Sequence, residues 1–290
     1  MRALQAAAPW GPDHLTIIEA PEPTPGHGEV LVRMKAVSLN YRDLMMINGM
    51  YGRGSAKAET LTPFSDGCGV VEAVGEGVTR VKVGDRVATL FFQGWISGPP
   101  TLEKAMTALG SPIPGAGREL AVFSQEGVSK VPDFLTDQQV ATLPCAALTA
   151  WRAMFEDADL SPGDTVVLQG TGGVSIFGLQ FAKAAGLRAL ITSSSDDKLA
   201  RAREMGADHL VNYRQTPEWS KPVREATGGV GADFIMEVGG QGTIDQSLKA
   251  VRIGGHIAII GVVAQGGAGI NPAVLIGNAA RMQGVFVGSR

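Results

Sequence analysis

The sequence predicts an α/β protein with two domains: a β-rich domain over residues 1–130 and a doubly wound parallel-sheet domain over residues 131–290. Three observations support this prediction. Alternating polar and apolar residues, punctuated by glycine and proline, dominate the first 130 residues. Later in the chain, short apolar runs alternate with helical patterns, as they do in parallel sheets. A glycine-rich turn at 170–175 joins one such run to a helix.

Turn residues divide the first domain into strands. We expect strands at 29–37, 69–75 and 86–90, each bounded by glycine or proline. The segment 93–117 is rich in glycine and proline, and we expect it to cross the surface with a short helix near 102–109.

The second domain has the alternation of strands and helices that parallel sheets require. Its first strand, at 165–169, is β-branched and apolar, and the next helix has an apolar face that ends at Gly186. We expect strands at 165–169, 189–192, 232–238, 256–262 and 284–287. We expect helices at 138–143, 146–157, 176–185, 196–205, 218–227 and 243–251.

The composition limits the classes of partner. The chain has 290 residues, of which 44% are hydrophobic and 18% are charged, and its net charge is −3. A chain of this length can bury two cores, and this charge gives no basic surface for nucleic acid. Because we find neither a signal peptide nor an apolar run of about 18 residues, we expect a cytoplasmic protein without a membrane partner.

The turn at 170–175 is the motif with the clearest chemical meaning. It contains Gly170, Thr171, Gly172, Gly173 and Val174. Glycines let a diphosphate approach backbone N–H groups at the positive end of a helix, so the turn predicts a dinucleotide site. Ser175 stands where the G-x-G-x-x-G pattern has its third glycine. The alternative is an ordinary glycine-rich connection between strand and helix.

The end of the next strand indicates which dinucleotide binds. A carboxylate there would bind both ribose hydroxyls of NAD, but residues 192–195 are a threonine and three serines. Hydroxyls and the nearby Lys198 suit a 2′-phosphate, so we expect NADPH rather than NADH. The negative charges of Asp196 and Asp197 would repel a 2′-phosphate. They are also explained as first-turn residues that complement the helix dipole, with Ser195 as N-cap.

Two further segments resemble a known family. One is GVVEAVGEGV at 69–78 with VGDRV at 83–87, and the other is LPCAALTAW at 143–151. With the glycine turn they resemble the medium-chain dehydrogenase/reductase superfamily over the whole chain, and within it the zinc-free, quinone-oxidoreductase-like, NADPH-dependent branch. The resemblance implies a GroES-like catalytic domain over 1–130 and a Rossmann cofactor-binding domain over 131–290.

The resemblance also bears on the metal. Zinc-dependent members hold their catalytic metal with two cysteines and a histidine, and the matching positions here are Asn40, Ser65 and Cys145. An amide and a hydroxyl do not replace thiolate and imidazole as ligands of Zn²⁺, so we expect no zinc. Cys68 and Cys145 make no disulfide framework, and we interpret both as small buried residues.

The implied activity is that of an NAD(P)-dependent oxidoreductase. Without a metal, hydride transfer to activated C=C or carbonyl substrates such as quinones and enones is favoured, with a hydrogen-bond donor stabilising the oxygen. One alternative is an NAD(P)-dependent alcohol dehydrogenase acting on alcohols or aldehydes. Another is a catalytically silent NADPH-binding protein.

The resemblance places Asn40 near the nicotinamide and Tyr51 in the substrate pocket, with Tyr41 and Asp43 as supporting candidates. For each, a structural hydrogen bond in a tight turn is the alternative. Beyond the glycine turn, the implied cofactor contacts are Thr149, Ser193, Ser194, Lys198, Tyr213, Gly239, Ile260, Gly261 and Phe286. Ser193, Ser194, Lys198 and Tyr213 are assigned to the 2′-phosphate side, and Gly239, Ile260, Gly261 and Phe286 to the nicotinamide half.

The family usually continues beyond the strand at 284–287 and returns to the catalytic domain, whereas this sequence stops at Arg290. We expect either a fragment or a catalytic domain that lacks part of its cover. In relatives the last strand pairs with its equivalent in a second subunit, so the resemblance implies a homodimer.

Overall fold

The computed structural model describes residues 1–50, 59–264, 266–267 and 269–290. The chain forms two compact units, the first consisting of Met1–Ala146 with Gly288–Arg290 and the second of Ala147–Val287. Helix α4 (Asp137–Ala141) lies with the first unit, because its Val140 and Ala141 pack against Cys68 and Ala88. The boundary drawn from the sequence at residue 130 stays a prediction.

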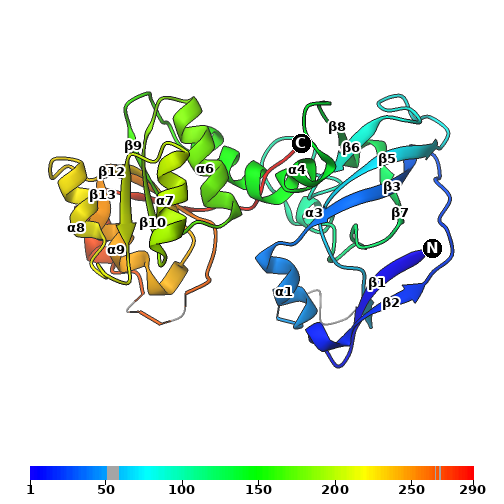
Figure 1. Cartoon of the computed structure of the whole chain (residues 1–290), viewed down its shortest axis with the longest axis horizontal. Helices are drawn as coiled ribbons and strands as arrows, with labels where there is room; N and C mark the ends of the chain where they lie inside the picture. Colours follow the sequence, from blue (N-terminus) through cyan, green and yellow to red (C-terminus); the bar gives the residue numbers. More distant parts are fainter. Residues whose placement is uncertain (51–58, 265, 268) are drawn as a thin grey trace. The chain divides into compact units, whose positions relative to one another are not determined.

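A parallel sheet is the centre of the second unit. Its strands are β9 (Thr165–Leu168), β10 (Arg188–Ser193), β11 (His209–Asn212), β12 (Ala232–Glu237), β13 (Val251–Ile259) and β14 (Arg281–Gly284). Figure 1 labels four of them, β9, β10, β12 and β13. Across the described residues the strands lie in the order β11-β10-β9-β12-β13-β14, and neighbouring strands are parallel. This is the order 3-2-1-4-5-6 of dinucleotide-binding sheets, so the predicted fold class is confirmed.

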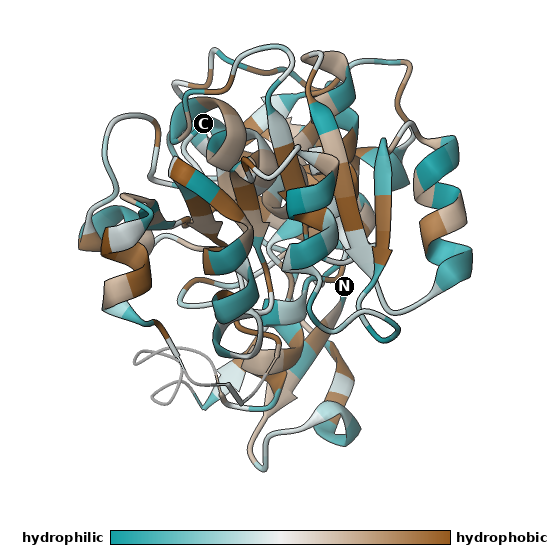
Figure 2. Ribbon diagram, turned by 90° about the vertical axis from the view of Figure 1, so that its left-hand side faces the viewer, coloured by the Kyte–Doolittle hydropathy of each residue, from teal (hydrophilic) through white to brown (hydrophobic). Residues whose placement is uncertain are grey.

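Helices cover both faces of this sheet. They are α6 (Gly173–Ala184), α7 (Asp196–Glu204), α8 (Ser220–Ala226) and α9 (Ile244–Ala250), together with α10 (Pro272–Gly277) near the end of the chain. The predicted helix at 146–157 has an α-helical middle, α5 (Leu148–Trp151), flanked by wider π-helical turns at Leu143–Ala147 and Arg152–Glu156. Figure 2 shows the expected amphipathic pattern: the outward faces of the helices are largely hydrophilic (teal), and the strands behind them are hydrophobic (brown).

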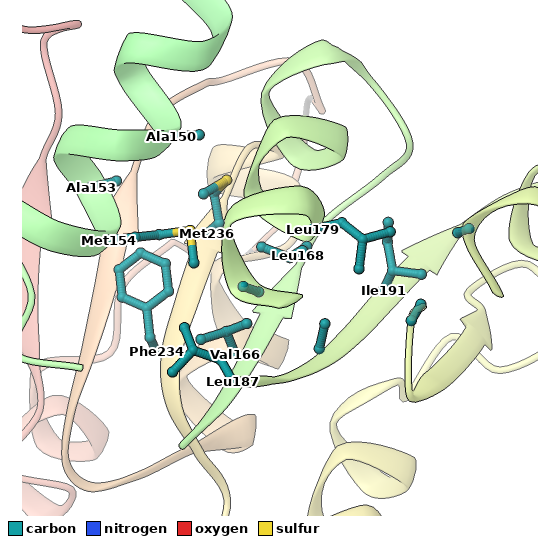
Figure 3. Packing of buried hydrophobic residues seen from close by; sticks show 14 of the residues in the cluster. Ala150, Ala153, Met154, Val166, Leu168, Leu179, Leu187, Ile191, Phe234 and Met236 are labelled. Carbon is teal, nitrogen blue, oxygen red and sulfur yellow. The ribbon is translucent and has the colours of Figure 1, made fainter. Parts of the chain in front are cut away.

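Successive residues of each buried strand enter different cores. Val166 and Leu168 of β9 pack with Leu179 of α6 and Phe234 of β12 on one face, as Figure 3 shows. Val167, between them in sequence, packs on the other face with residues of α8 and α9. The continuous apolar run of β9 is therefore explained, because both of its faces are buried.

The first unit is antiparallel β structure. Within its described part, one sheet has the order β7-β3-β5-β6-β8 and another the order β2-β1-β4. The first sheet contains β3 (Glu29–Ser38), β5 (Asp66–Val74), β6 (Arg86–Thr89), β7 (Leu120–Ser124) and β8 (Val128–Lys130), and the second contains β1 (Arg2–Ala7), β2 (Leu15–Glu19) and β4 (Thr60–Leu61). Short helical segments are α1 (Tyr41–Ile47), α3 (Leu102–Ala105) and the 3₁₀ turns Pro12–His14, Gln125–Gly127 and, in the second unit, Gly240–Gly242.

One predicted strand is misplaced. The sequence placed the last strand at 284–287, but the structure has it at Arg281–Gly284. The N–H of Val285 still donates to the carbonyl of Ile259, yet Val287 adopts a left-handed φ of 48°, which is incompatible with a continuing strand. Over the described ranges of the chain, no helix is long and apolar enough to cross a membrane.

Candidate cofactor-binding and catalytic site

The strand order of the second unit reverses at β9 and β12. These strands are neighbours, and Leu168 near the end of β9 faces Met236 near the end of β12. Ligands of doubly wound sheets bind at the carboxyl ends of the strands where the order reverses. A cavity of about 310 Å³ opens at this place, and Gly170, Thr192, Tyr213 and Gly239 are among the residues that line it.

The glycine turn has the geometry that phosphate binding requires. Gly170 has a left-handed φ of 75°, and a Cβ at Gly170 or Gly172 would meet no atom within 4 Å. Gly172 is the N-cap of α6 and provides no capping side chain. The first-turn N–H groups of a helix have no intrahelical acceptor, so those of Gly173 and Val174 can bind an anion that approaches over open backbone.

The structure explains why a serine, Ser175, can occupy the position of the third glycine in the motif. Its side chain is buried, and its hydroxyl donates to the carbonyl of Gln169 at 2.6 Å, which fixes the turn to the end of β9. Close packing of α6 on the sheet occurs one turn later, at Gly178. A Cβ there would lie 3.0 Å from a methyl group of Leu168 and 3.1 Å from the methyl group of Met236.

Hydroxyl groups cluster where β10 ends. The hydroxyl oxygens of Thr171 and Ser193 lie 3.3 Å apart, and the hydroxyl of Thr192 accepts the N–H of Gly170 at 3.2 Å. Ser194 is half-buried and Lys198 is exposed in the first turn of α7. The structure therefore brings Thr192 and Ser193 against the glycine turn, and Ser194 and Lys198 follow them in the chain.

The nearby carboxylate of Asp196 has other partners. One of its oxygens accepts from the side-chain amide of Asn212 at 2.7 Å and the other from that of Gln215 at 2.9 Å. Ser195 is the N-cap of α7, as expected, and its hydroxyl accepts the N–H of Lys198. Both hydrogen bonds join Asp196 to residues at or just after the end of β11, so this carboxylate has a structural role.

A buried polar network that the sequence did not predict supports the floor of the site. Glu237 has no exposed surface, and it accepts hydrogen bonds from the side chains of Gln169, Thr243 and Ser247 and from the N–H of Gly240 at 2.9 Å. The carbonyl oxygen of the Gln169 side chain accepts the N–H groups of residues 238 and 239 at 3.1 and 3.2 Å. Polar residues at the ends of adjacent apolar strands were the signal in the sequence.

The other predicted cofactor residues lie at scattered positions in the second unit. Thr149 is buried on α5. The N–H groups of Ile260 and Gly261, just after β13, donate to the carbonyl of Glu237 at 2.8 and 3.4 Å. Phe286 follows β14 and is 39% exposed. Their contacts with a cofactor, and that of Gly239 with its nicotinamide half, stay predictions.

In the first unit, two of the predicted catalytic residues form a helix start. Asn40 is the N-cap of α1, and its N–H donates to the carboxylate of Asp43 at 2.7 Å. Desolvation raises the pKa of the buried Asp43. Tyr41 is 56% exposed, and Tyr51 lies outside the described residues. Asn40 and Asp43 thus have a structural role, whatever further role they have in catalysis.

Asp66 is a buried carboxylate beside Asn40, and its role was not evident from the sequence. It is fully buried at the start of β5 and accepts from the hydroxyl of Ser65 at 2.6 Å and from the N–H of Cys145 at 2.9 Å. Burial raises its pKa to about 6, against the lowering effect of its hydrogen bonds. The amide of Asn40 lies near enough to lower this pKa, although its Nδ2 makes no hydrogen bond of normal geometry.

Comparison with known proteins identifies the family. Residues 26–133 match the profile described as "Alcohol dehydrogenase GroES-like domain", and residues 173–290 match "Zinc-binding dehydrogenase". A zinc-type alcohol dehydrogenase-like protein of Schizosaccharomyces pombe is 42% identical over 268 residues, which are 90% of this chain and 77% of that protein. The chain belongs to the medium-chain dehydrogenase/reductase superfamily.

Solved structures agree with this membership. An NAD-dependent alcohol dehydrogenase is similar with a TM-score of 0.91 and 33% identity, covering 100% of this chain and 85% of that one. A mycobacterial protein complexed with NADPH has a TM-score of 0.82 and 28% identity, covering 99% and 82%. Other relatives are named alcohol dehydrogenase or quinone oxidoreductase. The protein is an NAD(P)-dependent oxidoreductase of this superfamily.

Zinc, which parts of the superfamily use, can be tested against the side chains at the three matching positions. Asn40 offers an amide, the buried Ser65 a hydroxyl that already donates to Asp66, and Cys145 a half-buried thiol. This set contains one ligand that Zn²⁺ prefers, so it does not fit a catalytic zinc site. Among the described residues, no group of three or more histidine, cysteine, aspartate or glutamate side chains could hold a metal ion.

The two cysteines differ in environment. Cys68 is buried in the core, as expected, and burial raises its pKa to about 12. Cys145, on the π-helical turn at Leu143–Ala147, is half-buried rather than buried as expected. Neither forms a disulfide.

Proposed function

We propose that the protein is an NADPH-dependent, zinc-independent oxidoreductase that transfers hydride to activated C=C or carbonyl substrates such as quinones and enones. The main support for the proposal is the set of side chains at the end of β10. Hydroxyl groups lie there beside an open glycine turn, and the carboxylate of Asp196 is bonded to two amides on the other side.

The preference for NADPH follows from charge and hydrogen bonding. A 2′-phosphate carries close to two negative charges and needs donors, which the hydroxyls of Ser193 and Ser194 and the ammonium group of Lys198 supply. A dinucleotide-binding site selective for NAD has a carboxylate at this strand end instead. The NADPH complex of a mycobacterial relative is consistent with this choice.

The chain's own residues would bind and orient the cofactor. The first-turn N–H groups of Gly173 and Val174 hold the diphosphate, and Tyr213 lines the cavity next to the ribose side. When bound, NADPH supplies the hydride. In the first unit, Asn40, Tyr41 and Tyr51 are the proposed donors for the substrate oxygen, with Asp43 fixing the main chain of Asn40.

Zinc independence rests on the donor set. Asn40 and Ser65 stand where the zinc enzymes have ligands. The Ser65 hydroxyl donates to Asp66, and the amide of Asn40 lies beside the same carboxylate. Hydrogen-bond donors rather than a Lewis acid would then stabilise the developing oxyanion, which suits conjugated substrates whose negative charge is delocalised.

An alcohol dehydrogenase activity is the second candidate. The names of the relatives favour it, and so does the thiol of Cys145. Stoichiometric zinc in the purified protein, with alcohol oxidation that a chelator abolishes, would establish it. Binding of NADPH without turnover on any substrate would instead indicate a silent binding protein.

The test begins with calorimetric titration of NADPH and NADH, followed by a panel of quinones, enones, aldehydes and alcohols with the preferred cofactor. We expect tighter binding of NADPH. Replacing Lys198 by alanine should weaken NADPH about tenfold and leave NADH unchanged, because one charge-assisted contact is lost. The control is Lys221→Ala, an exposed lysine on α8 that pairs with Glu218. Equal affinity for the two cofactors in the unmodified protein contradicts the proposal.

We also propose that the chain forms a homodimer through β14, which is the edge strand of the sheet beside β13. An edge strand leaves backbone groups that a second copy can pair. Light scattering during size-exclusion chromatography should give twice the monomer mass, and a monomeric mass at micromolar concentration would refute this assembly.

A further inference from the structure

One side chain in the cavity of the second unit has a fixed orientation. The side-chain oxygen of Gln246, on α9, accepts the backbone N–H of Ser220 at 3.2 Å and the hydroxyl of Ser220 at 2.8 Å. A backbone N–H can only donate, so the amide atom facing it must be the oxygen. The amide nitrogen, Nε2, therefore points away from Ser220.

Gln246 is one of the residues lining the cavity of about 310 Å³ at the end of the sheet. Within the described part of the chain, no acceptor is found for its Nε2, and this nitrogen is not among the buried polar atoms that lack a partner. The cavity is therefore lined by a half-buried amide donor whose orientation is set before any ligand binds.

The walls of the cavity suit a flat aromatic base. Pro217 and Trp219, from the connection between β11 and α8, line it together with Val238 and Val263. Gly170 and Thr192 line the same cavity, so it continues to the glycine turn. A base bound here would be joined through its ribose to a diphosphate at that turn, which is the arrangement of the adenosine half of a dinucleotide.

We propose that Gln246 is a specificity-determining residue for adenine, donating a hydrogen bond from Nε2 to a ring nitrogen of the base. Adenine presents ring nitrogens as acceptors, and a donor held by two bonds from Ser220 loses little freedom when it binds them. This role rests on the proposed function, because it requires the nucleotide to occupy this cavity.

Gln246→Glu is the sharpest test, because it preserves size and still accepts both bonds from Ser220. It replaces the donor with a carboxylate oxygen, which repels the lone pair of a ring nitrogen. We expect NADPH and NADH to bind at least tenfold more weakly, with an unchanged urea midpoint. The kcat/KM for reduced nicotinamide mononucleotide, which has no adenosine, should stay within twofold.

Two further variants control the result. Gln241→Glu adds the same charge on the neighbouring 3₁₀ turn, where residue 241 is exposed, and should leave NADPH affinity within twofold. Gln246→Met keeps the length without the donor, and it serves if the glutamate variant does not fold. It should weaken NADPH several-fold.

The outcomes separate the two claims. Unchanged NADPH affinity in Gln246→Glu or Gln246→Met overturns the role of Gln246 while the proposed function stands. An equal loss with reduced nicotinamide mononucleotide also overturns it, because the effect would not come from adenine. Failure of the unmodified protein to bind NADPH or NADH overturns both claims.

Discussion

Replacing Asp66 by asparagine tests the account of the first unit. Asp66 is fully buried and accepts hydrogen bonds from the Ser65 hydroxyl and the Cys145 N–H. An asparagine can still accept from Cys145 with its oxygen and donate to the Ser65 hydroxyl with its nitrogen. The substitution therefore preserves the shape and hydrogen bonding but removes the ability to ionise.

The size of the effect follows from the pKa of Asp66, which burial raises from 3.8 to about 6. Between these values the unfolded chain releases a proton that the folded chain retains. The wild-type protein therefore loses stability as the pH rises from 3.8 through 6, and the loss is complete above that range. A shift of about two units corresponds to roughly 3 kcal/mol.

Urea unfolding of both proteins at a series of pH values measures this term. The free energy of unfolding of Asp66→Asn minus that of wild type should rise by roughly 3 kcal/mol between about pH 3.5 and pH 7.5. The other titrating groups are common to both proteins, and their contributions cancel except for that of Asp43, whose charge interacts with that of Asp66. Asp13→Asn, which changes an exposed carboxylate, should show no such slope. A pH-independent difference for Asp66→Asn, or one that falls with pH, refutes the reasoning.

Two further substitutions test the second unit. Glu237→Gln leaves at least one of the four donors around this buried side chain without its acceptor, so the free energy of unfolding should fall by about 1–3 kcal/mol, measured by urea at pH 7; an unchanged midpoint would contradict the network. Burial lowers the pKa of His256 to about 4, so wild type should lose stability relative to His256→Leu as the pH falls from 6.5 towards 4. A flat difference over that range would show that His256 is not held neutral in the fold.

Local pattern was sufficient to predict the second unit because its strands are buried on both faces. The run 165–169 predicted β9, and the adjoining glycines predicted the start of α6 within a few residues. The last strand was misplaced because the apolar run 284–287 resembles a strand, whereas Val287 has a left-handed φ of 48° that the apolar pattern does not indicate.

The first unit was harder to predict, because its strands pair over long distances in sequence. Strand β1 pairs with β2 and with β4, which lies more than 50 residues away, and β3 pairs with β7 across about 90 residues. Strands β1, β4, β7 and β8 were therefore not selected individually, and β2 was missed as well, although it pairs with the adjacent β1. Antiparallel pairing depends on register and on partners that a short window of sequence does not contain.

The candidate site was predictable where backbone geometry determines it. Gly170 and Gly172 lie in the open turn expected of them, and Ser195 caps α7. The sequence did not show that Asp196 is bonded to Asn212 and Gln215, because these bonds join side chains from different elements. Asp66 and Glu237 were missed for the same reason. A buried carboxylate can be recognised only when the three-dimensional structure shows which donors surround it.

A crystal structure of the protein soaked with NADPH tests the central claim most directly. We expect the diphosphate within hydrogen-bond distance of the N–H groups of Gly173 and Val174, and the 2′-phosphate beside Ser193, Ser194 and Lys198. A nucleotide bound elsewhere with the turn at 170–174 empty, or a zinc ion coordinated by Cys145, would contradict the account.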